Sequence, residues 1–286
     1  FAMRIVYVNG KFFNEEDATI SVFDRGFLFA DAVYEVIPII NGYLIENDAH
    51  MRRLRRSMEE LDIQKPATEN ELISIQNELI TKNDVKSGLL YLQVTRGKAD
   101  RDFSFPKDTK TSLIMFTQKR NLLSNPSLRK GITVITIPDI RWKRRDIKSI
   151  GLLAQSMAKQ FAIDSGADDA WMVEEGFVTE GSSSNTFIIT SDEKLITRNL
   201  SNQILHGITR DSIIRICRNE GLTVEERPFS LDEAYSSVEA FSTASSSFIL
   251  PVVNIDGHHI ANGLPGPVTC KIQTLYFEMI NQIAYH

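Results

Sequence analysis

Apolar and polar positions in the first third of the chain follow the two-residue period of β-strands and then the longer period of α-helices. Segments 5–13 and 34–46 are short and rich in β-branched and aromatic residues, which is typical of strands. Asn41 and Gly42 interrupt the second segment between apolar stretches, and this pair is a strong hairpin signal. The pattern therefore predicts that the chain opens with antiparallel strands.

The next segment changes to helical spacing. A helix is expected from about residue 47, where either Asn47 or Asp48 could supply the capping side chain. Its buried stripe consists of apolar residues that recur every three or four positions: Met51, Leu54, Met58 and Leu61. A second helix is expected over 69–82, and two strands, over 89–97 and 111–118, flank a polar loop. These elements form the first predicted domain, residues 1–118.

Segment 119–131 contains Asn, Ser, Pro and Gly without periodicity, so it is predicted to be an interdomain linker. The second and larger domain, residues 132–286, is expected to start with a strand that ends near Lys148 and a helix that closes at Gly166. The later segments predict short strands and two helices: strands over 170–180, 185–190, 194–198 and 239–245, and helices over 207–221 and from 265 onward. This mixture predicts an α+β protein of two domains with a ligand cleft between them.

Composition limits the classes of function. The chain has 286 residues, of which 42% are hydrophobic and 24% charged, as in an ordinary globular protein. The net charge of -5 argues against nucleic-acid binding, which needs a basic surface. No apolar run reaches the ~18 residues of a membrane helix and no signal peptide is recognisable, so the expected location is the cytoplasm. The histidines and cysteines lack the spacings of metal sites, so no bound metal is expected.

Lys148 lies between the predicted strand and helix, in the segment RWKRRDIKS. Most lysines are exposed, and this one could simply belong to a solvated basic cluster. Alternatively, its amine could form a Schiff base, which requires a pKa well below the ordinary value of ~10.4. Arg141, Lys143, Arg144 and Arg145 could supply the positive charge that lowers this pKa. These residues alone leave both interpretations open.

Three further segments offer polar groups from turns or helix starts. Glu180 precedes a Gly-Ser-Ser-Ser turn, and a strand ending there would hold its carboxylate rigidly. A carboxylate fixed in this way can keep the ring nitrogen of a bound aromatic ligand protonated. Segment 205–211 contains a predicted helix start beside a glycine, whose amides and dipole favour an anion. Arg52 and Arg53 have no acidic residue four positions later, which leaves one of them available for an external anion. Each of these signals is weak alone.

Together, however, the motifs resemble one family. The similarity extends over FDRGFLFADAVYEV, VTRGKADRDFSFP, DIRW, RDIKS, EGSSSN, GITRD and ERPF, which span nearly the whole chain. These motifs are similar to those of the fold-type IV pyridoxal-phosphate aminotransferases (class IV), and most similar to the D-amino-acid aminotransferases among them. The resemblance implies a two-domain α+β fold with pyridoxal 5′-phosphate in the interdomain cleft and most of its contacts in the larger domain.

The resemblance also implies roles for individual residues. Lys148 would form the Schiff base with the cofactor and move the proton between the substrate Cα and the cofactor, while Glu180 would pair with the pyridine nitrogen. The other cofactor-binding residues would contact different parts of the cofactor. The phosphate would be bound by Arg53, Ile208, Thr209 and Ser245. Arg141 would lie near the 3′ oxygen, Leu205 would pack on the ring, and Ser183 in the Gly-Ser-Ser-Ser turn would be a further cofactor contact.

The substrate side of the site departs from the family pattern. Tyr34 and Arg101 match the tyrosine and arginine that bind the substrate α-carboxylate in the D-specific enzymes, where the arginine comes from the neighbouring subunit of a homodimer. The histidine expected two residues beyond that arginine is Phe103 here. Arg96, in the same loop, could compensate, because a guanidinium binds a carboxylate through two parallel hydrogen bonds.

The implied activity is transfer of the amino group between D-amino acids, of the D-alanine and D-glutamate type, and 2-oxo acids by a ping-pong mechanism. An L-branched-chain aminotransferase of the same fold is the first alternative, followed by an aminodeoxychorismate lyase and an (R)-amine transaminase. A non-catalytic protein that binds pyridoxal phosphate is an alternative from a different class. The expected partners are small amino acids, 2-oxo acids and a second copy of the chain.

Overall fold

The computed structural model describes residues 3–285 and divides the chain into two compact units. Unit 1 comprises the chain up to Leu122, the segment Ile147–Gly151 and the last residues from Ile283, and unit 2 comprises Leu123–Asp146 and Leu152–Gln282. The boundary after Leu122 falls within the segment predicted to be the linker. Residues 1–2 and 286, which the predicted domains included, lie outside the described residues.

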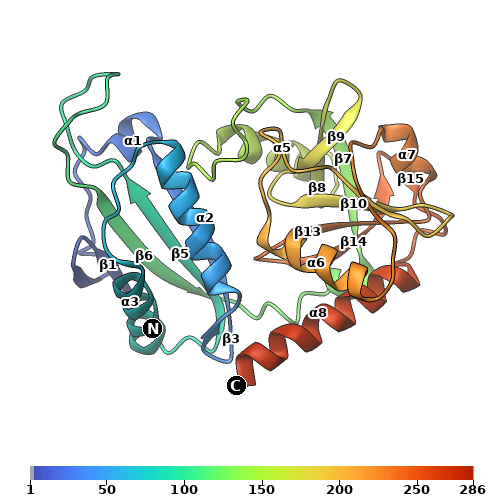
Figure 1. The fold of residues 1–286 in the computed structure, drawn as a ribbon, viewed down its shortest axis with the longest axis horizontal. Coiled ribbons are helices and arrows are strands. Elements are labelled where there is room, and N and C mark those ends of the chain that lie inside the picture. Colours follow the sequence, from blue (N-terminus) through green and yellow to red (C-terminus); the bar gives the residue numbers. More distant parts are fainter. Residues whose placement is uncertain (1–2, 286) are drawn as a thin grey trace. The chain divides into compact units, whose positions relative to one another are not determined.

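Unit 1 is built on a six-stranded antiparallel sheet (Figure 1). Its strands are β1 (Ile5–Val8), β2 (Lys11–Asn14), β3 (Ala32–Ile40), β4 (Tyr43–Leu44), β5 (Ser87–Thr95) and β6 (Ser112–Lys119), and their order in the sheet is β2-β1-β6-β5-β3-β4. The predicted hairpin is confirmed, since Asn41 and Gly42 join β3 to β4 with φ angles of 51° and 85°. Asparagine and glycine adopt positive φ more easily than other residues, which suits this tight turn.

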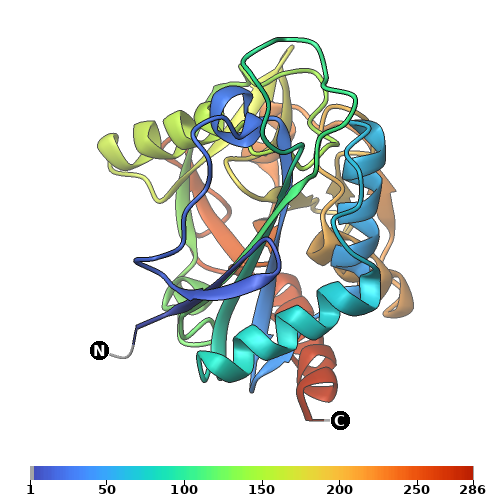
Figure 2. The same cartoon turned by 90° about the vertical axis from the view of Figure 1, so that its left-hand side faces the viewer.

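The helices of unit 1 are α1 (Arg25–Phe29), α2 (Asn47–Glu60) and α3 (Glu69–Lys82). The longer two, α2 and α3, cover one face of the sheet (Figure 2). The predicted stripe of α2 is confirmed, because Met51, Leu54 and Met58 are buried in the core between this helix and the sheet. The 3.6-residue period of α2 thus fixes which of its polar residues point toward β3.

The predicted cap of α2 is wrong. Asn47 is the first residue of the helix, and the preceding Glu46 occupies the cap position with a φ of 54° and no capping hydrogen bond from its side chain. Asn47 instead donates from its side-chain amide to Gln76 of α3 at 2.7 Å. A tertiary contact has therefore replaced the local one, whereas Thr68 and Glu71 form a complete capping box at the start of α3.

Unit 2 contains a nine-stranded mixed sheet (Figure 1). Its strands are β7 (Ile132–Pro138), β8 (Asp169–Glu174), β9 (Phe177–Gly181), β10 (Asn185–Ile189), β11 (Leu195–Thr197), β12 (Val224–Glu226), β13 (Glu239–Ala244), β14 (Phe248–Ile255) and β15 (His258–His259). The strands β8 and β9 are antiparallel, and so are β10 and β11. The sheet also has parallel pairs, since β7 lies between β14 and β8 and runs parallel to both.

The helices of unit 2 are α4 (Ser127–Lys130), α5 (Leu153–Asp164), α6 (Ile208–Asn219), α7 (Leu231–Ser236) and α8 (Pro267–Tyr285). The predicted ends of α5 and α6 are confirmed by Gly166 and Gly221, which both follow their helices with φ of 79°. Within residues 3–285, no helix combines the length and apolar character that a membrane span requires.

Candidate active site

Lys148 belongs to unit 1, because its segment, 147–151, lies along the open edge of β3. The short strand β4 pairs only with the end of β3 and leaves the start of that edge open. Tyr34 of β3 donates its backbone N–H to the Lys148 carbonyl oxygen at 3.0 Å, and the Lys148 N–H donates to Ser57 Oγ of α2 at 3.3 Å. The sequence placed Lys148 just past a strand end in the larger domain. In the structure β7 already ends at Pro138, and the lysine is held by β3 and α2.

The side chain of Lys148 lies over the ring of Tyr34. Its Nζ is 4.3 Å from the ring centroid, within the range of a cation–π contact. Tyr34 stacks on Tyr91 at a centroid distance of 5.6 Å, and Tyr91 stacks on Phe116 at 4.7 Å. Three strands thus supply a stack of rings that restricts the Tyr34 ring and gives the lysine a defined neighbour.

Glu35, Arg53 and His50 form a buried charge cluster on the other face of β3. Arg53 donates from Nε and Nη2 to the two carboxylate oxygens of Glu35 at 2.8 and 2.7 Å, and His50 Nδ1 lies 2.7 Å from Oε2. Burial opposes ionisation of Glu35, but the charge and hydrogen bonds of Arg53 outweigh it and lower the pKa to about 2. The pKa of His50 is lowered by burial and, further, by the charges of Arg53 and Lys148. Of the two arginines that the sequence left available for an external anion, Arg53 therefore pairs with Glu35, a residue of a strand, and its contact with an anion stays a prediction.

Arg96 and Arg101 lie in very different surroundings. Arg96 is buried and donates from Nε to Asp31 at 2.7 Å, and from its two terminal nitrogens to the carbonyl oxygens of Asp62 and Leu61 at 2.9 and 2.6 Å. Three of its donors therefore serve the fold, and the expectation that Arg96 compensates for Phe103 stays a prediction. Arg101 is exposed.

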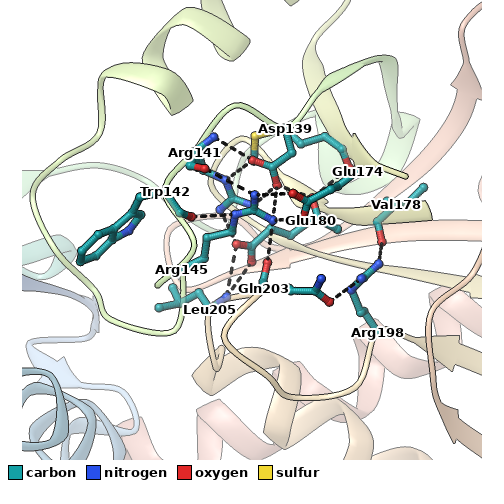
Figure 3. A network of polar contacts seen from close by, with 12 residues as sticks. Asp139, Arg141, Trp142, Arg145, Glu174, Val178, Glu180, Arg198, Gln203 and Leu205 are labelled. Atoms are coloured by element: carbon teal, nitrogen blue, oxygen red, sulfur yellow. Dashed lines mark hydrogen bonds and ion pairs between the residues drawn. The ribbon is translucent and has the colours of Figure 1, made fainter. Parts of the chain in front are cut away.

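In unit 2, Glu180 lies on β9 and is buried (Figure 3). Its carboxylate accepts hydrogen bonds from Arg141 Nη1, from Asn185 Nδ2 at 3.1 Å and from the backbone N–H of Leu205 at 3.1 Å. Burial raises the pKa of Glu180, and the charge and hydrogen bond of Arg141 offset only part of this effect. The predicted rigid placement of this carboxylate by a strand is thus what the structure shows.

Arg141 is shared between two carboxylates. It donates to Asp139 from Nε at 3.0 Å and from Nη2 at 2.7 Å, and its remaining terminal nitrogen, Nη1, reaches Glu180. Asp139 also accepts from the Thr179 hydroxyl at 2.6 Å and pairs with Arg145 at 3.1 Å. Burial opposes ionisation of Asp139, but the hydrogen bond and charge of Arg141 prevail and lower its pKa. Two carboxylates therefore compete for one guanidinium.

The basic cluster around Arg141 is compensated by acidic residues. The four cations pair with carboxylates of unit 2: Arg141 with Asp139 and Glu180, Lys143 and Arg145 with Glu174, and Arg144 with Asp146. The positive charge of these four residues is therefore balanced by neighbouring carboxylates.

The start of α6 offers backbone donors close in sequence to Leu205. Gly207 occupies the cap position and has no side chain to bond the amides of Ile208 and Thr209. It packs tightly on Asn185, since a Cβ at Gly207 would lie 2.0 Å from Asn185 Oδ1. Asn185 also donates to the Leu205 carbonyl oxygen at 3.0 Å. One asparagine therefore links the helix start to the Glu180 carboxylate.

Both serines that were predicted to bind the cofactor lie in turns. Ser183 is exposed between β9 and β10, and Ser245 is half-buried between β13 and β14. Their contact with a cofactor stays a prediction. Among residues 3–285, His, Cys, Asp and Glu side chains form no group of three or more that could hold a metal ion.

Four contributing residues were not singled out from the sequence: Glu35, His50, Asp139 and Asn185. Glu35 carried a usable signal, because a single charged residue within the apolar run YEVIPII points to a buried partner. His50 lies three residues before Arg53, on the same face of α2. For Asp139 and Asn185 the local sequence offers no comparable signal.

Comparison with known proteins identifies the family of the chain. The family described as amino-transferase class IV matches residues 32–255. The chain belongs to the class IV aminotransferase family. It is 38% identical over 275 residues to a D-alanine aminotransferase of Bacillus licheniformis, covering 95% of each chain, and 37% identical over 271 residues to one of Staphylococcus epidermidis, covering 95% of this chain and 96% of the relative. The resemblance inferred from the motifs is thus confirmed.

Solved structures of the family share the fold. A branched-chain amino acid aminotransferase of T.th., solved with pyridoxamine 5′-phosphate, is 26% identical with a TM-score of 0.89, over 97% of this chain and 94% of that one. The enzyme of Escherichia coli has a TM-score of 0.90 at 24% identity, over 96% and 94% of the two chains, which shows the fold alone. The predicted α+β fold of type IV is confirmed.

Pyridoxal phosphate is the cofactor of this family, and the residues present fit its chemical groups. The cofactor presents a carbonyl, a basic ring nitrogen and a phosphate. Lys148 provides a positioned amine, Glu180 a buried carboxylate, and the start of α6 uncapped amides suited to a phosphate.

Proposed function

We propose that this chain is a D-amino-acid transaminase that exchanges the amino group between D-amino acids, of the D-alanine and D-glutamate type, and 2-oxo acids in a ping-pong reaction. The observation that carries the proposal is the 38% identity to a D-alanine aminotransferase over 95% of both chains. The second candidate is an L-branched-chain aminotransferase, which the similar solved structures favour at lower identity.

Lys148 is the proposed Schiff-base and proton-transfer residue. Pyridoxal phosphate, when bound, withdraws electrons from the substrate Cα and so acidifies its proton. Lys148 would take this proton from Cα as a general base and, as a general acid, would return it to the cofactor carbon, and in the second half-reaction it would carry a proton in the opposite direction. Its backbone bonds to Tyr34 and Ser57 support this role, because they fix the point from which the amine acts.

Glu180 is the proposed partner of the ring nitrogen. A carboxylate that accepts the N–H of the ring keeps that nitrogen protonated and so favours electron withdrawal from Cα. The burial of Glu180 strengthens such a bond, and Asn185 and Leu205 fix its orientation. Arg141 is proposed to lie near the 3′ oxygen and Leu205 to pack on the ring.

The phosphate is proposed to bind Arg53, the amides of Ile208 and Thr209, and Ser245, with Ser183 nearby. Glu35 holds the Arg53 guanidinium in one orientation through two hydrogen bonds. A helix start without a capping side chain favours a dianion through its amide donors and its dipole.

Tyr34 and Arg101 are the proposed ligands of the substrate carboxylate, with Arg101 supplied by the second subunit of a cytoplasmic homodimer. The exposure of Arg101 supports this role, since its guanidinium is available to an external group. Phe27 and Phe103 in the same region are 75% and 78% exposed, which is unusual for aromatic rings unless another surface covers them.

The proposal is tested by incubating the purified holoenzyme with D-alanine and 2-oxoglutarate and measuring D- and L-glutamate by chiral chromatography. L-leucine replaces D-alanine in a parallel reaction. We expect product from D-alanine and little from L-leucine, and the reverse result would establish the second candidate. Arg101→Ala should raise the KM for D-alanine about 10- to 100-fold, because a hydrogen bond to a charged group is worth ~1.5–3 kcal/mol. The matched control is Lys107→Ala, which removes another exposed cation of the same loop.

A further inference from the structure

Residues 97–111 form a polar loop between β5 and β6 that carries Arg101. In two views the loop extends beside α1, within unit 1 (Figures 1 and 2). We call residues 97–111 the recognition loop. Loops of this length without secondary structure of their own are uncommon in compact domains unless they have a function.

The base of the recognition loop is closed by backbone contacts. Arg25 donates its backbone N–H to the Gly97 carbonyl oxygen at 2.8 Å. Gly97 has a φ of 102°, and a Cβ there would lie 2.0 Å from the carbonyl oxygen of Lys110 at the other end of the loop. Only glycine satisfies both conditions, so the two ends of the loop are held together.

Above this base lies a buried group of charges that we call the clamp: Arg25, Asp31 and Arg96. Arg25 and Arg96 both donate from Nε to the same oxygen of Asp31, each at 2.7 Å. Arg25 also donates from Nη1 to the carbonyl oxygens of Asp102 and Ser104, at 2.6 and 3.3 Å. These last two bonds hold the loop at the first and third residues after Arg101.

Aromatic rings complete the hold on the loop. The Phe105 ring lies 3.6 Å from the guanidinium carbon of Arg96. The ring centroids of Phe103 and Phe29, which lies in α1, are 5.5 Å apart. The guanidinium carbon of Arg101 lies 5.3 Å from the Phe29 centroid and 5.4 Å from the Phe103 centroid. Among residues 3–285, Arg101 has no carboxylate partner, whereas Arg25 and Arg96 share Asp31.

We propose that Arg25 is a positioning residue that fixes the recognition loop and thereby prepares Arg101 for the carboxylate of the substrate. The inference rests on the proposed function for the identity of the substrate. Its physical basis is preorganisation: a side chain already held in its binding position loses less entropy when the ligand arrives. Arg25 is buried, and its side chain donates to Asp31 and to the loop itself, so its effect on Arg101 passes through the loop.

The test compares Arg25→Lys with the wild-type holoenzyme. Lysine keeps the charge but cannot donate to Asp31 and to two carbonyl oxygens in the fork geometry of arginine. We expect hydrogen–deuterium exchange in peptides covering 97–111 to become about tenfold faster, with exchange of α3 peptides unchanged. We also expect the KM for D-alanine to rise about tenfold, with kcat within about twofold of wild type. Asp31→Asn provides a second variant if Arg25→Lys fails to fold.

A double-mutant cycle separates positioning from general damage. In an Arg101→Ala background, Arg25→Lys should change the KM for D-alanine by less than about twofold, since its effect passes through Arg101. An equal effect in both backgrounds, or unchanged exchange in the recognition loop, would overturn the proposal. Failure of the proposed function appears separately, as absence of turnover in the wild type, and the exchange measurement then still decides whether the clamp holds the loop.

Discussion

Glu35 and Glu180 are both buried glutamates bonded to an arginine, yet their carboxyl pKa values move in opposite directions. Glu35 receives Nε and Nη2 of Arg53 and a further bond from His50, and its pKa is lowered to about 2. Glu180 receives one nitrogen of Arg141, and burial raises its pKa.

The difference lies in how the arginine is shared. Arg53 gives Nε and Nη2 to one carboxylate, that of Glu35, whereas Arg141 gives the same two nitrogens to Asp139 and its Nη1 to Glu180. Glu35 is therefore satisfied within the fold, and Glu180 remains an under-compensated acceptor. A buried carboxylate with this deficit is well suited to bind a protonated ring nitrogen. Glu35 therefore stabilises the fold, whereas Glu180 keeps the acceptor capacity that its proposed role at the ring nitrogen requires.

The largest effect is expected at Lys148, the residue on which the proposed reaction depends. Lys148→Ala should lower kcat with D-alanine and 2-oxoglutarate by on the order of 10⁴-fold or more, since it removes both the Schiff base and the proton carrier. Steady-state kinetics measure this loss, and Lys143→Ala is the control because that side chain is an exposed neighbour. Substantial turnover in Lys148→Ala would show that another amine carries the reaction.

Glu180→Gln should lower kcat by about 10²- to 10³-fold, because a neutral amide cannot hold the ring nitrogen protonated. Its free energy of unfolding in urea should stay close to that of the wild type. The substitution removes the charge pairing with only one nitrogen of Arg141, which stays paired with Asp139. A variant with normal kcat and greatly reduced stability would reverse the roles that we assign to the two glutamates.

Glu35→Gln should lower the free energy of unfolding by about 3 kcal/mol, because Arg53 stays buried without its counter-charge. Urea denaturation of the apo-protein provides the measurement. Glu69→Gln, which removes the exposed partner of Arg55, should change the same quantity by less than about 1 kcal/mol. If the two variants lose equal stability, the buried cluster of Glu35, Arg53 and His50 does not stabilise the fold.

The two glutamates should also give pH effects of opposite sign. The folded pKa of Glu35, about 2, lies below its ordinary value of 4.5, so its contribution is present above pH 4.5 and is lost as the pH falls toward 2. Linkage gives a loss of about 1 kcal/mol by pH ~4, which should be absent in Glu35→Gln. Glu180, with its raised pKa, instead contributes stability that is lost as the pH rises through that pKa. An unchanged acid slope in Glu35→Gln would contradict this assignment.

Local signals in the sequence predicted much of the fold. The Asn41–Gly42 hairpin and the glycines that end α5 and α6 follow from backbone preferences of single residues, and the structure confirms them. The motifs around Lys148 and Glu180 likewise indicated the family. These features depend on neighbours within a few positions, which a sequence displays directly.

Contacts between distant segments were not predictable in the same way. The pairing of Arg53 with Glu35 and the docking of segment 147–151 on β3 join residues that are far apart along the chain. Arg96 and Arg101 are chemically identical and five positions apart, and only the fold reveals that Asp31 and two carbonyl oxygens occupy the first. Composition and period do not encode such choices.

The central claim is best tested by the absorbance spectrum of the purified holoenzyme, recorded before and after addition of D-alanine and, separately, of L-leucine. The account predicts that D-alanine abolishes the long-wavelength band of the cofactor joined to Lys148 and that L-leucine leaves it in place. Loss of the band with L-leucine alone would contradict the account and assign the chain to the branched-chain enzymes.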